Sequence, residues 1–186
     1  MPRIRPVTPD DAARIAAIYE PVVRDTAVSF ELEPPSPEEM GRRIETVTPG
    51  HPWLVSEEEG NVVAYAYATA FRQRPAYRWS AETTVYVDGD HQGQGVGRHL
   101  YGALIEVATL WGFANAYAGI ALPNPASESL HASIGFTPVG VFPRAGHKFG
   151  RWHDVGWWHR PLSPTEPPRS PTTPPAHQVQ ALLSNR

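Results

Sequence analysis

Three alternating glycines stand where a predicted strand gives way to a predicted helix. The segment DGDHQGQGVGRHL covers residues 88–100 and holds Gly93, Gly95 and Gly97. Glycine costs about 1 kcal/mol relative to alanine in a helix interior, so three of them at a helix start need a reason. The N-terminus of a helix exposes unpaired N–H groups and the positive end of the helix dipole, and glycine lets an anion approach the backbone. The pattern indicates either a pyrophosphate site or a tight turn without a ligand.

Two other glycine motifs do not fit this segment. A dinucleotide fold requires G-x-G-x-x-G, with an acidic residue about 20 positions further on. Here the spacing is G-x-G-x-G, and the residue 20 positions after Gly97 is Tyr117. A Walker-type phosphate loop requires Lys followed by Ser or Thr, and neither follows Gly97. Both motifs are therefore set aside.

The composition excludes several classes of protein. The net charge is −3 without a basic run, so nucleic acid is not an expected partner. The chain has no cysteine, which excludes a disulfide scaffold, a thiolate metal site and a cysteine nucleophile. The N-terminus lacks the apolar core of a signal peptide, and the longest apolar stretch, residues 62–71, is too short to span a bilayer. We expect a cytoplasmic protein with no metal and no membrane partner.

The elements that must position the glycine segment follow from periodicity and from start and stop signals. Prolines behind Thr8 and Ser36 mark two early helix starts, and Glu59-Gly60-Asn61 splits two strand-like runs into a hairpin. The predicted order is β-α-α-β-β-β-α-β-α-β-β, which favours an α+β fold with a mixed sheet. The predicted strands cover residues 3–7, 52–58, 62–70, 82–89, 115–122, 136–142 and 153–160, and the predicted helices cover 9–23, 37–47, 96–111 and 125–135.

The composition changes sharply after Arg160. Residues 161–186 contain seven prolines and no Phe, Trp or Tyr. Proline removes a backbone donor and restricts the residue before it, so we predict that this segment forms neither a ladder nor a long helix. The expected organisation is one folded domain over residues 1–160 and a disordered, proline-rich tail over residues 161–186.

The glycine segment resembles a motif of the GNAT acetyltransferases. Gln92-x-x-Gly95-x-Gly97, after a strand and before a helix, is similar to their Q/R-x-x-G-x-G/A acyl-CoA motif, and the order of elements is similar as well. Longer segments resemble the phosphinothricin N-acetyltransferases and the methionine sulfone and sulfoximine acetyltransferases within that family. They are residues 25–34, 51–60, 82–97, 121–124 and 145–158, so the resemblance covers about residues 3–160. It implies a single GNAT-like domain with a mixed, mostly antiparallel sheet flanked by helices.

The resemblance implies acetyl-CoA as the cosubstrate. The backbone of the glycine segment would wrap the pyrophosphate, the preceding strand would bind the pantetheine arm, and Asn124 would contribute its side-chain amide. These residues are Val85, Tyr86, Val87, Gly93, Gln94, Gly95, Val96, Gly97, Arg98 and Asn124. Position 93 departs from the family, which usually has Arg or Lys there, so one cationic phosphate contact is missing. Asn before Pro is also an ordinary turn residue.

Two residues are candidates for the chemistry. The resemblance assigns the general base to Glu82, which in a strand shares a face with Thr84 and Tyr86. The alternative is an exposed strand carboxylate. On the helix 125–135, His131 shares a face with Leu130 and Ile134 and would point inward. It would act in the chemistry or be a packed, hydrogen-bonded histidine.

The acceptor site is the part in which the sequence departs most from the family. Arg72, Arg74 and Tyr77 would hold the anionic groups of the acceptor, because guanidinium groups suit carboxylate and phosphinate; the alternative is a solvated loop face. Phe30 would line the acceptor pocket or belong to the core.

The expected activity is acetyl transfer to the α-amine of a small anionic amino acid, such as phosphinothricin or methionine sulfoximine. The alternatives are a silent acyl-CoA-binding sensor and a GNAT enzyme acting on a protein, a polyamine or another amine. The resemblance also implies a homodimer.

Overall fold

The early helices begin where proline and capping residues predict them. In the computed structural model, which describes residues 2–163 and 170–184, a 3₁₀ turn at Pro9–Asp11 leads into α1 (Ala12–Asp25). Asp11 accepts a 2.8 Å hydrogen bond from the Thr8 N–H and pairs with Arg5, which ties this helix start to the first strand. The helix α2 (Pro37–Val47) begins behind Ser36, whose hydroxyl accepts a 3.2 Å hydrogen bond from the Glu39 N–H.

Seven strands form one mixed sheet in the order β1-β2-β3-β4-β5-β7-β6. Every neighbouring pair is antiparallel except β4 and β5, which run parallel. The predicted strands and their order are confirmed, although the last two are longer than expected. The strands are β1 (Arg3–Pro6), β2 (Trp53–Glu58), β3 (Asn61–Ala70), β4 (Ser80–Val87), β5 (Asn115–Ala121), β6 (Thr137–Lys148) and β7 (Arg151–Pro161).

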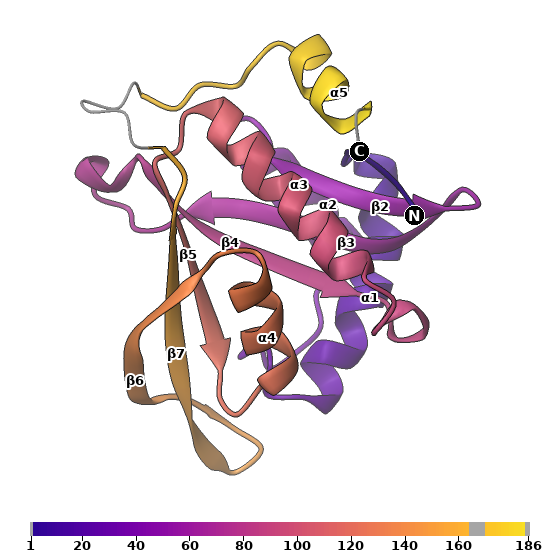
Figure 1. The fold of residues 1–186 in the computed structure, drawn as a ribbon. Coiled ribbons are helices and arrows are strands. Elements are labelled where there is room, and N and C mark those ends of the chain that lie inside the picture. The colour runs from indigo at the N-terminus through magenta and orange to yellow at the C-terminus, as the bar shows by residue number, and fades with distance from the viewer. Residues whose placement is uncertain (1, 164–169, 185–186) are drawn as a thin grey trace.

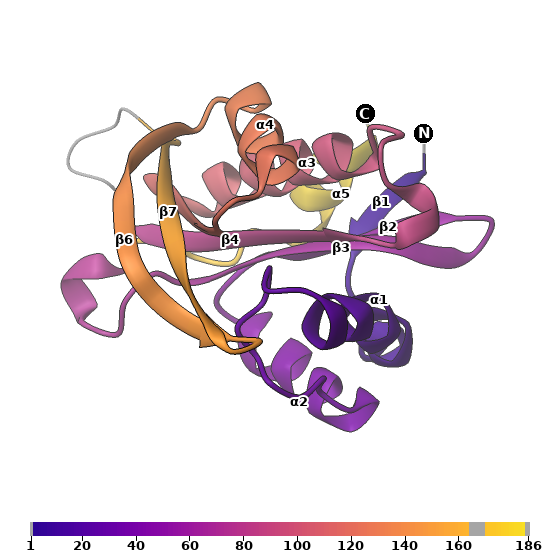
Figure 2. The same ribbon diagram turned by 90° about the horizontal axis from the view of Figure 1, so that it is seen from below.

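Helices cover both faces of this sheet and divide the core into two clusters (Figures 1 and 2). The helices α3 (Val96–Trp111) and α4 (Pro125–Ser133) lie on one face, where Leu100 and Leu104 are fully buried. The helices α1 and α2 lie on the other face, where Ile15 and Tyr65 are buried. Burying one such side chain contributes about 1.5–3 kcal/mol, so each helix is held to its face by a few apolar residues. In the described residues, no helix is long and apolar enough to cross a membrane.

The C-terminal segment differs from the predicted disordered tail. Residues 176–184 form α5 (Ala176–Ser184), whose Val179 and Leu183 are buried against the cluster around α3. Upstream, the Thr172 N–H donates a 2.9 Å hydrogen bond to the Trp111 carbonyl. The prediction failed here because all seven prolines lie before residue 176, so the argument against a helix does not apply to residues 176–184. Part of the predicted tail, residues 164–169 and 185–186, lies outside the described residues.

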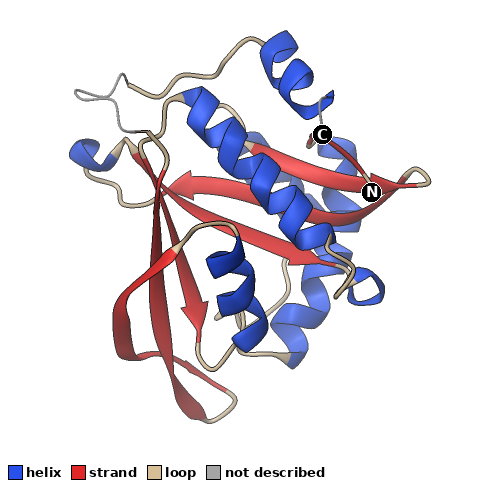
Figure 3. Ribbon diagram, in the orientation of Figure 1, coloured by secondary structure: helices blue, strands red, loops and turns tan. Residues whose placement is uncertain are grey.

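The last helix, α5, thus lies near the first strand, β1, although the two are at opposite ends of the sequence (Figure 3). Contacts of α5 with both α3 and β1 place the last helix beside the first strand. The C-terminal helix thus covers apolar surface of α3 with its own buried side chains.

We expect Leu183→Ala to destabilise the whole domain, because it removes a buried side chain that packs on the main core. Large-to-small core substitutions of leucine cost about 2–5 kcal/mol, and the low end applies to a helix at the edge of the core. Urea unfolding of the full chain measures this loss of unfolding free energy. Gln178→Ala, at an exposed position of the same helix, is the matched control and should change stability by less than about 0.5 kcal/mol. Equal stabilities of Leu183→Ala and wild type would show that α5 does not contribute to the fold.

Candidate active site

The parallel strands β4 and β5 separate after a short ladder. They pair only from Ser80↔Asn115 to Glu82↔Tyr117. Beyond this point β4 stays with β3 and β5 stays with β7, so the two strands diverge into a fork that is visible in Figure 1. Among the described strands, none pairs with the inner edge of β4 beyond Glu82. The fork therefore offers the inward-facing backbone groups of Val85 and the Val87 N–H to a ligand that enters between the strands, since the Val87 carbonyl already accepts from Gln92.

The glycine segment lies at the open end of this fork, and its glycines have two different roles. Gly93 and Gly95 have φ angles of 73° and 83°, in the left-handed region that favours glycine. A Cβ on Gly97 would lie 3.1 Å from the Val87 side chain, so Gly97 permits the close approach of α3 to β4. Gln92 fixes the turn by donating a 3.1 Å hydrogen bond to the Val87 carbonyl.

Because α3 begins at Val96, its first N–H groups have no acceptor one turn earlier in the helix. These amides and the positive end of the α3 dipole lie next to the fork, as the predicted anion site requires. A hollow of about 630 Å³ beside Gly95 is lined by Arg98 and Arg160. Arg98 was a predicted site residue, whereas nothing in the sequence pattern distinguished Arg160 at the end of β7. Gln94 donates its side-chain amide to the Asp90 carbonyl and so stabilises the turn itself.

Glu82 occupies the root of the fork, at the last paired position of β4 and β5. Alternation along β4 places Thr83 and Val85 toward α3, so Glu82 and Tyr86 face the α1 and α2 side. The sequence predicted that these two residues share a face, but not which helices it meets. Burial raises the pKa of the Glu82 carboxyl, while the positive charge of Arg72 lowers it to a smaller extent. A carboxylate in this state is a better proton acceptor than an exposed one.

His131 points inward from α4, and both of its ring nitrogens have partners. Its Nδ1 lies 2.7 Å from the Ser127 carbonyl, which can only accept, so Nδ1 carries the proton. Nε2 then accepts from the Tyr101 hydroxyl at 3.1 Å. The Thr83 hydroxyl lies 2.7 Å from that of Tyr101 and also donates to the Tyr117 carbonyl at 3.2 Å. Burial lowers the pKa of His131, which favours this neutral form. Thr83, Tyr101 and His131 form a chain of hydrogen bonds, and all three are buried. The sequence did not single out Tyr101, because a tyrosine at this position looks like any other apolar residue of the helix.

Asn124 caps α4. Its side-chain oxygen accepts a 3.1 Å hydrogen bond from the Ser127 N–H, after a cis peptide bond between Leu122 and Pro123. The turn role considered for this residue is therefore present, and the side-chain NH₂ group is the part that remains for a ligand.

The residues predicted to hold the acceptor fall into two groups. Arg72, Arg74 and Tyr77 line one hollow of about 320 Å³ in the loop between β3 and β4. The Arg72 guanidinium lies 4.3 Å from the Phe71 ring centroid and 5.4 Å from that of Trp157, and its charge acts on Glu82. Phe30 lies elsewhere, in the loop between α1 and α2, where its ring packs against Gly146 and is 6.0 Å from His153.

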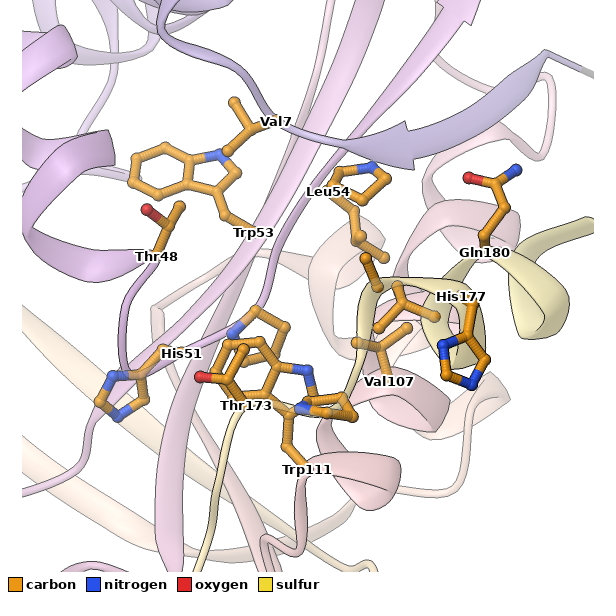
Figure 4. A pocket seen from close by; sticks show the side chains of 15 residues that line it. Val7, Thr48, His51, Trp53, Leu54, Val107, Trp111, Thr173, His177 and Gln180 are labelled. Atoms are coloured by element: carbon orange, nitrogen blue, oxygen red, sulfur yellow. The ribbon is translucent and has the colours of Figure 1, made fainter.

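Another pocket, of about 570 Å³, lies away from the fork and from the predicted acceptor residues. It is enclosed by β2, α3 and the C-terminal segment, and its lining includes Leu54, Val107 and Trp111 (Figure 4). Its lining contains none of the predicted catalytic or acceptor residues. The chemistry is therefore assigned to the fork and not to this cavity.

Comparisons with known proteins agree with this geometry. Residues 4–157 match the family described as acetyltransferase (GNAT) domain. The chain is 41% identical over 166 residues to a phosphinothricin N-acetyltransferase of Streptomyces viridochromogenes, covering 89% of this chain and 91% of that protein. It is 36% identical over 157 residues to an L-methionine sulfoximine/L-methionine sulfone acetyltransferase of Pseudomonas aeruginosa, covering 83% and 91%. A phosphinothricin acetyltransferase from Sinorhizobium meliloti, solved in complex with AcCoA, superposes with a TM-score of 0.84 at 36% identity, covering 90% of this chain and 95% of that one.

We expect Arg72→Met to raise the pKa of Glu82, because the substitution removes the positive charge that lowers it and leaves the burial that raises it. Carboxyl NMR titration of the folded protein measures this pKa directly. Arg78→Met is the matched control, since it removes an exposed cation of the same loop that has no part in the Glu82 shift. An unchanged or lower pKa in Arg72→Met would contradict the assigned electrostatics of the site.

Proposed function

This chain belongs to the GNAT acetyltransferase family, and we propose that it acetylates the α-amine of a small anionic amino acid, using acetyl-CoA. Phosphinothricin, methionine sulfoximine and methionine sulfone are the model acceptors, because relatives that match most of the chain are named for them. The observation that carries the proposal is the place of Glu82. A half-buried carboxylate with a raised pKa lies at the root of a strand fork whose open end is bordered by a helix N-terminus.

The residues around the fork fit coenzyme A. Pantetheine carries amide groups, and the unpaired inner edge of β4 over Val85, Tyr86 and Val87 can bind them as a neighbouring strand would. The pyrophosphate is an anion, and the segment from Gly93 to Arg98 offers first-turn amides without a Cβ at three positions. We propose that the Val87 N–H polarises the acetyl carbonyl and that the Asn124 NH₂ group contacts the coenzyme.

Glu82 is the proposed general base. An amino acid binds as an ammonium ion, and it becomes a nucleophile only after it loses a proton. The Glu82 carboxylate accepts this proton, directly or through water, and its raised pKa brings it closer to that of the amine. His131 lacks a free nitrogen in the hydrogen-bonded state described above. We therefore propose that His131 positions Tyr101 and Thr83 beside the fork and does not transfer a proton in the reaction.

Arg72, Arg74 and Tyr77 are the proposed anchors of the acceptor's acidic groups. Three guanidinium groups in one hollow, those of Arg72, Arg74 and Arg78, favour an anionic amino acid over a polyamine, whose charge they would repel. Phe30 is the proposed apolar wall on the α1 and α2 side. These roles rest on the charge and placement of the side chains.

We further propose a cytoplasmic homodimer. The hairpin β6–β7 exposes several large apolar side chains, and β6 is an edge strand 12 residues long. These side chains are Val139, Val141, Phe142, Phe149 and Trp152, and such a surface is typical of an interface. Light scattering of the purified chain tests the dimer, and a monomer at all concentrations would contradict it. A cytoplasmic location follows from the use of acetyl-CoA, a polyanion that does not cross membranes unaided, and cell fractionation tests it.

We expect the wild-type chain to release free thiol from acetyl-CoA in the presence of at least one of the three model acceptors. Glu82→Gln keeps the shape but cannot accept a proton, so kcat should fall about 10²–10⁴-fold while both KM values stay nearly unchanged. The residual rate should rise with pH, because more amine is then already neutral. Tight acetyl-CoA binding without turnover of any acceptor would favour a silent sensor, and an unchanged kcat in Glu82→Gln would remove Glu82 as the base.

We expect Gly95→Ala to raise the KM for acetyl-CoA several-fold while the acceptor KM stays unchanged, because a Cβ and a strained φ would disturb the anion site. Gly60→Ala is the matched control. Gly60 has a φ of 81°, close to the 83° of Gly95, but it lies in the turn between β2 and β3. Both variants therefore carry the same backbone strain, of about 1 kcal/mol. Equal KM values for acetyl-CoA in the two variants would contradict the assignment of the glycine segment.

A further inference from the structure

The chain has a single lysine, and that lysine is buried. The other 15 of its 16 lysines and arginines are arginines. Lys148, at the end of β6, is 5% exposed. Its ammonium donates hydrogen bonds to the Val23 carbonyl at 2.6 Å and to the Ser29 carbonyl at 2.8 Å. Burial lowers the pKa of Lys148, and the nearby negative charge of Glu31 opposes this effect.

A buried ammonium is costly, so its position needs a reason. Val23 belongs to the last turn of α1, where carbonyl groups lack helical partners and the dipole favours a cation. Ser29 belongs to the loop between α1 and α2. A compact ammonium on a thin stem can reach both carbonyls, whereas the broad planar guanidinium of arginine suits paired acceptors in one plane. Lys148 therefore joins the tip of the β6–β7 hairpin to a loop that is 119 residues distant in the sequence.

This loop is also fixed by other contacts, which converge on its middle. The Ser29 hydroxyl lies 2.6 Å from the Tyr19 hydroxyl, and Glu31 pairs with Arg43 of α2 at 2.7 Å. On the hairpin side, His153 donates from Nε2 to the Lys148 carbonyl at 3.1 Å. Figure 2 shows the loop beneath the sheet and beside the tip of the hairpin.

Phe30 lies between these fixed points. It directly follows Ser29, and a Cβ added to Gly146 would fall 2.5 Å from the Phe30 ring. The ring therefore lies flat against the backbone of β6. The Tyr19 ring, which holds the same loop, lies 4.9 Å from Tyr86 on the face of β4 that also carries Glu82. The clamped loop thus borders the side of the sheet that is proposed to receive the acceptor.

We propose that Lys148 is a positioning residue that clamps the loop of residues 26–31 to the β6–β7 hairpin and so holds Phe30 as a wall of the acceptor pocket. The effect on the acceptor rests on the proposed function, whereas the clamp itself does not. The hydrogen bonds of the clamp are accepted by the backbone carbonyls of Val23 and Ser29, so they do not depend on which side chains these two positions carry.

Three variants test the inference. Lys148→Met keeps the length of the side chain and removes its charge, and we expect the acceptor KM to rise about tenfold or more, since two charge-assisted hydrogen bonds are lost. The KM for acetyl-CoA should stay within about twofold, a split that general unfolding would not give. Gly146→Ala leaves the lysine in place and displaces only the Phe30 ring, so it should raise the acceptor KM at a nearly unchanged melting temperature. Arg151→Met removes an exposed cation of the same hairpin and should change neither KM.

The single lysine also gives a readout without turnover. Selective labelling of lysine yields one side-chain NMR signal, whose ammonium protons should exchange slowly with water in the wild-type chain, because the group is buried and hydrogen-bonded. Ammonium protons that exchange as fast as those of free lysine would overturn the clamp, even if Lys148→Met fails to fold. An unchanged acceptor KM in folded Lys148→Met or in Gly146→Ala would overturn the link between the clamp and the acceptor. If the wild-type chain acetylates no amino acid, the proposed function fails, and the exchange of the ammonium protons still decides whether the clamp exists.

Discussion

The early end of the ladder between β4 and β5 is the constraint on which the rest of the site depends. A parallel pair that continued beyond Glu82 and Tyr117 would satisfy the backbone of β4 and leave no edge for a ligand. At the root of the fork, hydrogen bonds of side chains, and not strand pairing, fix the position of β4. The Tyr101 hydroxyl of α3 is hydrogen-bonded both to the Thr83 hydroxyl of β4 and to the His131 ring of α4. Two helices and β4 therefore meet in one buried chain of hydrogen bonds. Such a chain has one low-energy arrangement, because any shift would leave a buried polar group unpaired.

In the proposed site, the two faces of the sheet serve different substrates. The face with α3 and α4 carries the glycine segment and the close contact of Gly97 with Val87, both of which belong to the proposed coenzyme site. The face with α1 and α2 carries Glu82 and the clamped loop with Phe30. Since side chains of a strand alternate between faces, one strand can serve both partners of a transfer reaction. In the proposed site, the inner edge of β4 binds the coenzyme, and Glu82, on the face toward α1 and α2, acts on the acceptor.

The sequence predicted the strands, four of the helices and their order, because long amphipathic runs and capping residues carry strong local signals. It predicted the inward direction of His131 and the shared face of Glu82 and Tyr86 for the same reason. It did not predict α5, since the prolines of residues 161–175 dominated the composition of a segment whose last part contains none. The Thr83–Tyr101–His131 chain and the Lys148 contacts were also missed. They join residues from 18 to 125 positions apart, and periodicity contains no information about such pairs.

The buried polar contacts of this chain lie where elements distant in the sequence must keep a fixed relation. Arg5 joins Asp11 and Glu57 where β1 meets β2 and α1, and Lys148 joins the hairpin to the acceptor loop. Apolar packing alone would hold these elements together but would tolerate small sliding motions, whereas a satisfied hydrogen bond in a buried site fixes one register. The contacts on the acceptor side are made largely by backbone carbonyls, and those at the fork are made by side chains. Since Ser29 and Glu31 use their side chains to hold the loop of residues 26–31, the exposed Val28 is a position where a substitution can change the surface of this loop and leave its contacts in place.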